Sequence, residues 1–257
     1  MTLRVRVLGC SGGAAPGRNP SCYLLEDGIA VDAGALAVGL TLEEQQRVGH
    51  VFLTHAHWDH VRDLPLTVIN RLPETPTLQV YGLADTIAAV RTHLMNGEVW
   101  FRAFDLPSEE SPFVAATTLV PGQTVPCGRY RITAVPVRHT VPAIGYLVDD
   151  GRGSVLLCAD TVGGGVLRDL PRSSPLRAVF LEASFPNRMQ EFAQMTGHLT
   201  PELLGEEVRD LPPDVDVIVT HLKPGFETEL ARELGDLGRR GVRPCRDGDV
   251  FEFSPPG

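Results

Sequence analysis

The chain reads Thr54-His55-Ala56-His57-Trp58-Asp59-His60 directly after the apolar run Val51-Phe52-Leu53. Such a run predicts a buried strand, and the polar residues then fall in the loop at its end. Imidazole and carboxylate groups are ligands of zinc and related first-row ions. Crowded together without a metal, they would leave polar atoms desolvated and unpaired, which is costly. The stretch therefore predicts a metal site, with His55 and His57 aimed at one point and Asp59 and His60 at a second.

Composition narrows the class of partner. The 257 residues are 43% hydrophobic and 21% charged, as in a globular protein with a substantial core. The net charge of −9 argues against nucleic acid, because binding a long polyanion needs a dense basic surface. It does not argue against a small anionic substrate, since bound metal ions supply local positive charge. No membrane span or signal peptide is evident, and five scattered cysteines suit a reducing compartment, so we expect a cytoplasmic protein.

Two metal ions need more ligands than the central stretch provides, and the others should also lie on rigid strand ends. His139, Asp160 and His221 each follow an apolar run and meet this condition. Asp32 also ends a predicted strand. It either orients a metal-binding histidine or merely caps the turn.

The order of elements predicts an α/β fold in which helices cover both outer faces of two packed mixed β-sheets. A hairpin is expected around residues 26–28, a capping-box helix after Thr41, and a helix over 84–95 that leaves His93 on its surface. Residues 96–112 fit a lid, a dimer contact or a covered loop, and residues 188–195 read as a polar, mobile segment. No linker or repeat is visible, so we expect one domain over residues 1–257. The predicted strands lie at residues 5–8, 21–25, 28–32, 51–53, 77–80, 113–120, 130–137, 144–148, 155–158, 179–181, 216–219 and 249–253, and further helices at 66–72 and 201–208.

The spacing His55-x-His57-x-Asp59-His60, followed by His139, Asp160 and His221, resembles the metallo-β-lactamase superfamily over nearly the whole chain. Asp32 matches that family's first motif. The resemblance implies an αβ/βα sandwich and two divalent ions, with zinc first and manganese or iron as alternatives. It assigns one ion to His55, His57 and His139, the other to Asp59, His60 and His221, and the bridging position to Asp160. A metal-bridging hydroxide would be the nucleophile.

Three further segments are similar to the class II cyclic-nucleotide phosphodiesterases: residues 8–13, residues 184–187 with 197–201, and residues 220–224. This similarity implies hydrolysis of a 3′,5′-cyclic nucleotide, cAMP or cGMP, to the 5′-nucleotide. It places His198 at the phosphoryl group, where it either binds a non-bridging oxygen or protonates the leaving oxygen. The alternative is that His198 only caps the next helix. Asp59 joins His198 as a candidate catalytic residue, and Thr200 and Lys223 join it as substrate-binding candidates.

Several alternatives stay open. The glycine-rich loop 9–17 either lines a pocket, offers amides to an anion or is a plain turn, and Lys223 either contacts phosphate or is a solvated turn residue. The main rival activity is that of the tRNA 3′-processing endonucleases, which usually insert a long arm where only 20 residues separate His139 from Asp160 here. A thioester hydrolase would want a C-terminal helical domain, and a β-lactamase an export signal. A non-catalytic metal-binding protein on the same fold, and a homodimer, are also compatible with the sequence.

Overall fold

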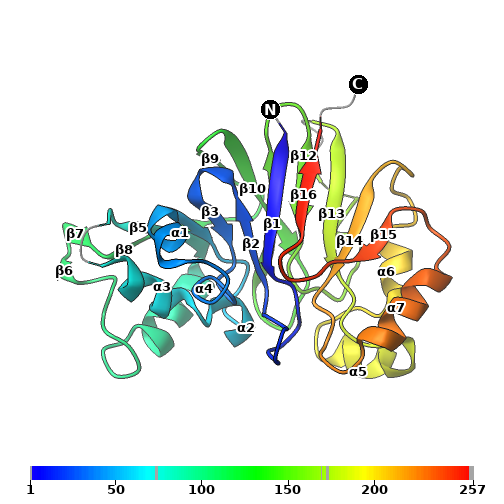
Figure 1. The fold of residues 1–257 in the computed structure, drawn as a ribbon, viewed down its shortest axis with the longest axis horizontal. Helices are drawn as coiled ribbons and strands as arrows, with labels where there is room; N and C mark the ends of the chain where they lie inside the picture. The colour runs from blue at the N-terminus through cyan, green and yellow to red at the C-terminus, as the bar shows by residue number, and fades with distance from the viewer. Residues whose placement is uncertain (1, 73–74, 169, 172–173, 255–257) are drawn as a thin grey trace.

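Two seven-stranded mixed sheets pack face to face, with helices on the outside of each (Figure 1). The structure is a computed structural model that describes residues 2–72, 75–168, 170–171 and 174–254. In the described residues the strand orders are β16-β1-β2-β3-β4-β5-β8 and β15-β14-β13-β12-β11-β10-β9, and β6 (Pro107–Ser108) pairs with β7 (Ser111–Pro112). The predicted α/β sandwich is confirmed.

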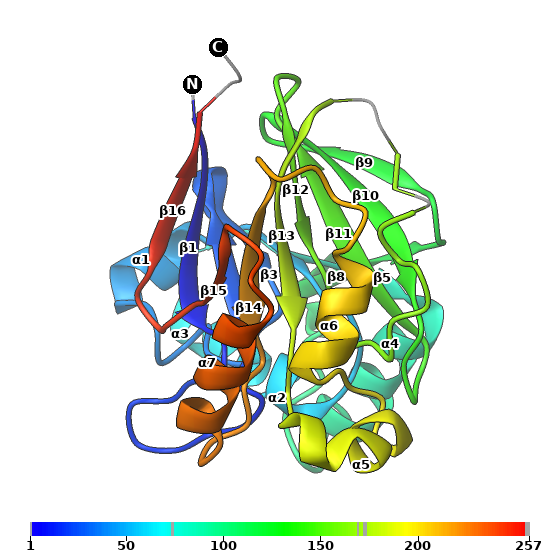
Figure 2. The ribbon, with the colours of Figure 1, turned by 90° about the vertical axis from the view of Figure 1, so that its right-hand side faces the viewer.

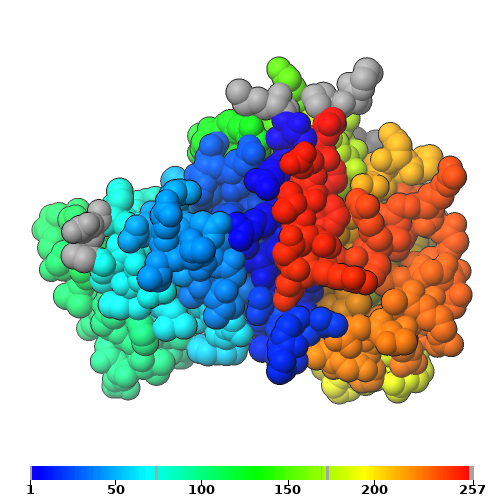
Figure 3. Space-filling model, in the orientation of Figure 1, coloured from blue at the N-terminus to red at the C-terminus, as the bar shows by residue number. Residues whose placement is uncertain are grey.

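The first sheet combines an antiparallel part, β16-β1-β2-β3, with a parallel part, β3-β4-β5-β8. The hairpin predicted around residues 26–28 joins β2 to β3. The last strand, β16, returns to pair with β1, and the two lie side by side across one face of the molecule (Figure 3). The strands are β1 (Leu3–Gly9), β2 (Cys22–Leu25), β3 (Ile29–Val31), β4 (His50–Phe52), β5 (Leu78–Leu83), β8 (Val114–Leu119) and β16 (Val250–Phe253).

In the second sheet β9 to β12 are antiparallel neighbours, while β12 to β15 run parallel. Because β10 and β12 both pair antiparallel with β11, β10 runs in the same direction as β12, β13 and β14. The carboxyl ends of these four strands therefore lie at the same end of the sheet. Sequence patterns missed the short strands β9 and β15. The strands are β9 (Thr124–Cys127), β10 (Tyr130–Val137), β11 (Ala143–Asp149), β12 (Ser154–Leu157), β13 (Leu176–Glu182), β14 (Asp216–Thr220) and β15 (Val242–Pro244).

Aromatic side chains fill the space between the sheets. Phe52 of the first sheet meets Tyr146 of the second edge-to-face, with ring centroids 5.3 Å apart, and Tyr23 meets Phe180 at 5.6 Å. All four are buried, and truncating a ring of this kind to alanine typically costs about 3–5 kcal/mol. The Tyr146 hydroxyl also donates to the carbonyl of Leu53 at 2.7 Å. This bond ties the second sheet to the loop that begins the histidine-rich stretch.

Helices cover the outer faces through separate apolar clusters, with α3 and α4 on the first sheet and α6 and α7 on the second (Figures 1 and 2). The capping box at Thr41 is confirmed, because its hydroxyl accepts from the Glu44 amide and the Glu44 carboxylate accepts from the Thr41 amide. The helices are α1 (Leu42–Arg47), α2 (Trp58–Val61), α3 (Leu64–Arg71), α4 (Ala84–Ala89) continued by a π-helical turn (Val90–Leu94), α5 (Gln190–Met195), α6 (Pro201–Glu207) and α7 (Glu227–Asp236). No helix in the described ranges is long and apolar enough to cross a bilayer.

Two segments that the sequence left ambiguous are now placed. Residues 96–112 are only partly covered: Ala103 and Phe104 are buried and Trp100 packs against the same apolar cluster, whereas Val99 and Leu106 are exposed. Residues 188–195, for which the sequence predicts a polar, mobile segment, contain α5, which packs through the buried Ala193 and through Phe192 against Phe185 at 5.2 Å between ring centroids. His93 is exposed, as predicted.

Candidate metal centre

The histidine-rich stretch leaves β4 as a loop and becomes α2, so its side chains turn back over the ends of the strands. His55 follows the strand, His57 is the N-cap residue of α2, and Asp59 and His60 lie in its single turn. The second sheet contributes residues that follow β10, β12 and β14, which are His139, Asp160 and His221. The two sheets thus bring their polar strand ends to one place.

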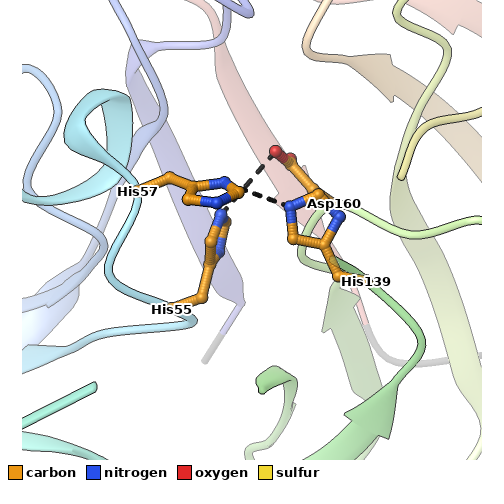
Figure 4. Close-up of side chains that lie close together, drawn as sticks. All are labelled: His55, His57, His139 and Asp160. Atoms are coloured by element: carbon orange, nitrogen blue, oxygen red, sulfur yellow. Dashed lines mark hydrogen bonds and ion pairs between the residues drawn. The ribbon is translucent and has the colours of Figure 1, made fainter. Parts of the chain in front are cut away.

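The first group of donor atoms belongs to His55, His57, His139 and Asp160, and these atoms lie within 4.8 Å of one another (Figure 4). Nδ1 of His57 is 3.1 Å from Nε2 of His139. Oδ2 of Asp160 is 3.8 Å from Nε2 of His55. Three imidazole nitrogens and one carboxylate oxygen therefore face a common centre.

A second group lies on the other side of Asp160. Nε2 of His221 is 3.2 Å from Oδ2 of Asp59, and the same nitrogen is 3.3 Å from Oδ2 of Asp160. Nε2 of His60 is 3.4 Å from that Asp160 oxygen. One carboxylate oxygen thus lies between both groups of ligand atoms.

The chemistry of these groups fits a divalent cation. Nε2 of His55 and Nε2 of His60 are buried, and within the described part of the chain neither has a hydrogen-bond partner. An unsatisfied buried polar atom costs about 1–3 kcal/mol, and a metal–nitrogen bond would remove that cost. Burial lowers the pKa of His55 well below its ordinary value, which keeps its ring neutral and able to coordinate. For His60, burial is outweighed by Asp160 and Asp32, which raise its pKa well above normal, so these carboxylates favour positive charge beside the ring, which a bound cation would supply in place of the proton.

Asp32 holds the His60 ring in place. Its Oδ2 is 2.7 Å from Nδ1 of His60, and its Oδ1 accepts the backbone N–H of Thr54 at 2.8 Å. A carboxylate on the far nitrogen fixes the tautomer and orientation of a metal-binding histidine. Asp32 adopts a left-handed backbone with φ of 59°, an uncommon conformation outside glycine that concentrates at functional sites.

Two glycines let the backbone approach ligand rings closely. Nδ1 of His139 donates to the carbonyl of Gly197 at 2.8 Å, and a Cβ at Gly197 would lie 2.5 Å from that nitrogen. A Cβ at Gly12 would lie 2.7 Å from Nδ1 of His221. The glycine-rich loop therefore packs directly behind a candidate ligand. His221 itself has φ of 60° and donates its N–H to the Cys10 carbonyl at 2.6 Å.

His198 lies beside Asp160 and His221 and is held by a buried carboxylate that sequence reasoning missed. Nδ1 of His198 is 2.9 Å from Oε1 of Glu182, the last residue of β13. Burial lowers the pKa of His198, but the charge of Glu182 and its hydrogen bond outweigh burial, so the pKa is raised. Ser184 adds a hydroxyl 2.9 Å from Nδ1 of His221. Glu182 ends an apolar strand, as the candidate ligands do, and this position could have marked it as a site residue in the sequence.

The remaining site candidates are Thr200 and Lys223, which were predicted to bind substrate. Thr200 is fully buried and caps α6 by accepting the Leu203 N–H at 3.5 Å, so His198 is not the cap of that helix. Lys223 is half-buried, with Nζ 5.8 Å from the ring centroid of Phe185, and that ring is in turn 5.8 Å from the ring of His198. Substrate contact by Thr200 or Lys223 stays a prediction.

An αβ/βα sandwich that gathers five histidines and two aspartates at its strand ends is the architecture of a metal-dependent hydrolase. The sequence model of the beta-lactamase superfamily domain matches residues 29–222. The chain belongs to the metallo-β-lactamase superfamily.

Individual members of this superfamily share a low sequence identity with the chain. The chain is 24% identical to a probable 3′,5′-cyclic-nucleotide phosphodiesterase of Yersinia pestis, over 88% of this chain and 79% of that protein. It is 28% identical to a ribonuclease Z of Methanococcus maripaludis, over 56% of this chain and 48% of that protein. Among solved structures, the metallo-beta-lactamase fold protein YhfI of Bacillus subtilis superposes with a TM-score of 0.77 at 22% identity, covering 98% of this chain and 100% of that one.

Proposed function

We propose that this protein is a cytoplasmic phosphodiesterase that hydrolyses a 3′,5′-cyclic nucleotide, cAMP or cGMP, to the 5′-nucleotide. The observation that carries the proposal is the pair of His198 and Glu182 beside the metal centre. Nδ1 of His198 is engaged by Glu182, which leaves Nε2 for a substrate. The cytoplasmic assignment rests on five buried cysteines, all with free thiols.

Two divalent ions, zinc or else manganese or iron, fit the two groups of ligands. His55, His57 and His139 would hold one, Asp59, His60 and His221 the other, and Asp160 would bridge them. Ions bound there would lower the pKa of a water molecule and withdraw negative charge from the phosphoryl oxygens. The buried Nε2 atoms of His55 and His60 are the chain's own support for this assignment.

His198 would act on the phosphoryl group. With Glu182 on Nδ1, its Nε2 can donate a hydrogen bond to a phosphoryl oxygen or pass its proton to the 3′-oxygen as the P–O3′ bond breaks. A raised pKa keeps more of the ring protonated near neutral pH, as an acid requires. Such a role typically contributes about 10²–10⁴-fold in rate.

Asp59 is the more accessible of the two central carboxylates. Its side chain is 24% exposed and that of Asp160 4%. Burial raises the pKa of Asp59, but the hydrogen bond with His221 and the charge of His60 outweigh it, so the group stays ionised. We assign to the ionised Asp59 carboxylate the role of orienting the attacking water or hydroxide by accepting a hydrogen bond from it.

Two observations favour a small substrate over tRNA. Between His139 and Asp160 the chain forms only β11, β12 and their connection, with no inserted arm. The net charge of −9 opposes a long polyanion. His198 can also group with Asp160 and His221 as a metal donor, but Glu182 is in none of the donor groups found among the described residues. Because Glu182 engages Nδ1 of His198, the pair favours a catalytic protein over a purely metal-binding one.

The test is turnover of cAMP and cGMP by metal-supplemented protein, beside bis(p-nitrophenyl) phosphate and a 3′-extended tRNA. Hydrolysis of cyclic nucleotides to 5′-nucleotides, lost on chelation and in His198→Ala but kept in the exposed-histidine control His93→Ala, is the expected result. Cleavage of the generic diester or the tRNA with cyclic nucleotides untouched would overturn the substrate assignment. No turnover of any diester by metal-loaded protein would overturn the enzymatic one.

A further inference from the structure

Large apolar side chains lie exposed on the two short helices next to the metal centre. Trp58 of α2 is 61% exposed, and Phe192 and Met195 of α5 are 42% and 70% exposed. The helix α2 comes from the first half of the chain and α5 from the second, and both lie at the same end of the molecule (Figures 1 and 2). Isolated exposed hydrophobic residues are ordinary, but several of them beside one polar site indicate a binding surface.

Contacts through His139 connect these helices. Trp58 directly follows His57, whose Nδ1 is 3.1 Å from Nε2 of His139. The other nitrogen of His139 is 2.8 Å from the carbonyl of Gly197, two residues after Met195. Trp58 and Met195 are therefore each within two residues of a direct contact to the same candidate ligand. Together with Phe192, they form what we call the apolar rim of the candidate metal centre.

Phe192 extends the same apolar rim toward His198. Its ring packs on Phe185 with centroids 5.2 Å apart, and Phe185 contacts His198 at 5.8 Å. The candidate ligand cluster is thus polar and, with metal ions bound, would bind an anion, whereas the exposed side chains beside it are aromatic and apolar. An occupant that matches both parts carries a phosphoryl group and a flat apolar portion.

We propose that Trp58, together with Met195, forms a hydrophobic clamp that stacks on the base of the nucleotide and so selects nucleotides over base-free phosphodiesters. The inference rests on the proposed cyclic-nucleotide function. With the phosphoryl group at the ligand cluster, the sugar and base extend outward to the rim. Stacking of a base on an aromatic side chain strengthens binding by about 5- to 150-fold.

Intrinsic fluorescence gives a direct test, because Trp58 and Trp100 are the two tryptophans of the chain. Trp100→Phe, at a partly buried position, leaves Trp58 as the sole tryptophan, which excitation at long wavelength separates from the tyrosines. Manganese- or zinc-loaded protein is titrated with AMP and with ribose 5-phosphate, which lacks the base. We expect AMP to quench Trp58 and to bind about 5- to 150-fold more tightly than ribose 5-phosphate.

Calorimetric titration of Trp58→Leu then isolates the stacking contact. The preference for AMP should be lost in Trp58→Leu and kept in Leu42→Ala, which removes an apolar group of the same 61% exposure on α1. In turnover, Trp58→Leu should raise KM for cAMP with kcat nearly unchanged, and should leave KM for ribose 3′,5′-cyclic phosphate as it was.

Two results would overturn the clamp and are distinguishable from each other. Equal affinity for AMP and ribose 5-phosphate, in protein that still hydrolyses cAMP, would remove the clamp and leave the proposed function standing. Absence of AMP binding together with absence of cyclic-nucleotide turnover would remove both.

Discussion

The carboxylate of Glu182, at the end of β13, lies 2.9 Å from Nδ1 of His198, and both side chains are buried next to the candidate metal ligands. Glu182 also accepts the backbone N–H of Thr161 at 2.8 Å, one residue after Asp160. A single carboxylate therefore fixes both the tautomer of His198 and the position of the loop that carries Asp160. Because Glu182 holds Nδ1, only Nε2 of His198 is left to donate a proton to a substrate.

Glu182→Gln should lower kcat by about 10- to 100-fold, the range expected when a carboxylate that orients a site histidine is removed. The charge of Glu182 raises the pKa of His198, so its loss lowers that pKa and the ring loses its proton at a lower pH. The alkaline limb of the kcat profile should move to lower pH. Glu206→Gln, an exposed glutamate on α6, is the control, and an unmoved profile in Glu182→Gln would refute the coupling.

His198→Ala should reduce turnover by about 10²–10⁴-fold, because it removes the proposed proton donor while all seven proposed metal ligands stay in place. Metal content measured by mass spectrometry should equal that of the unaltered protein. A variant that turns over at the normal rate would reduce His198 to a structural residue.

His57→Ala and Asp160→Ala should each abolish metal loading or turnover while the protein stays folded by circular dichroism. Asp160 matters to both groups of ligands, because its Oδ2 lies within 4 Å of His55, His60 and His221. Loss at Asp160 should therefore reduce the bound metal more than loss at His57. Full activity with unchanged metal content in either variant would contradict the ligand assignment.

Asp32→Ala should weaken metal binding by about 10- to 100-fold, since His60 loses the partner on its Nδ1. It should also lower the free energy of unfolding by about 1–3 kcal/mol, because the buried N–H of Thr54 loses its acceptor. Asp32→Asn is the matched comparison: asparagine tolerates the left-handed backbone and keeps an acceptor oxygen. Chemical denaturation and metal titration measure the two effects, and equal metal affinity in all three proteins would exclude an orienting role.

Metal removal should destabilise the fold as well as stop turnover. Without an ion, Nε2 of His55 and of His60 are left buried with no hydrogen-bond partner among the described residues. Adding zinc or manganese to chelated protein at about 100 times its dissociation constant should restore about 2.7 kcal/mol for one site, seen as a higher Tm. A Tm that does not respond to either ion would argue against a structural contribution from the metal.

The sequence by itself determined the architecture and the positions of the candidate ligands. Residues 54–60 are close in sequence, so a strand followed by one helical turn gathers their side chains through local geometry alone. His139, Asp160 and His221 were detectable because each follows an apolar strand, and strand ends pointing the same way share one edge of a sheet. The capping box at Thr41 and the exposed His93 likewise depend only on neighbouring residues.

Only the tertiary structure decided which side chains orient those ligands. Asp32 meets His60 across 28 residues and Glu182 meets His198 across 16, and no periodicity encodes such a pairing. The same holds for β16 beside β1, for the packing of Trp100 against the apolar cluster of the first sheet and for the contacts of His139 with His57 and Gly197. These contacts depend on how two sheets, each from distant parts of the chain, pack through their aromatic faces, which a local pattern does not specify.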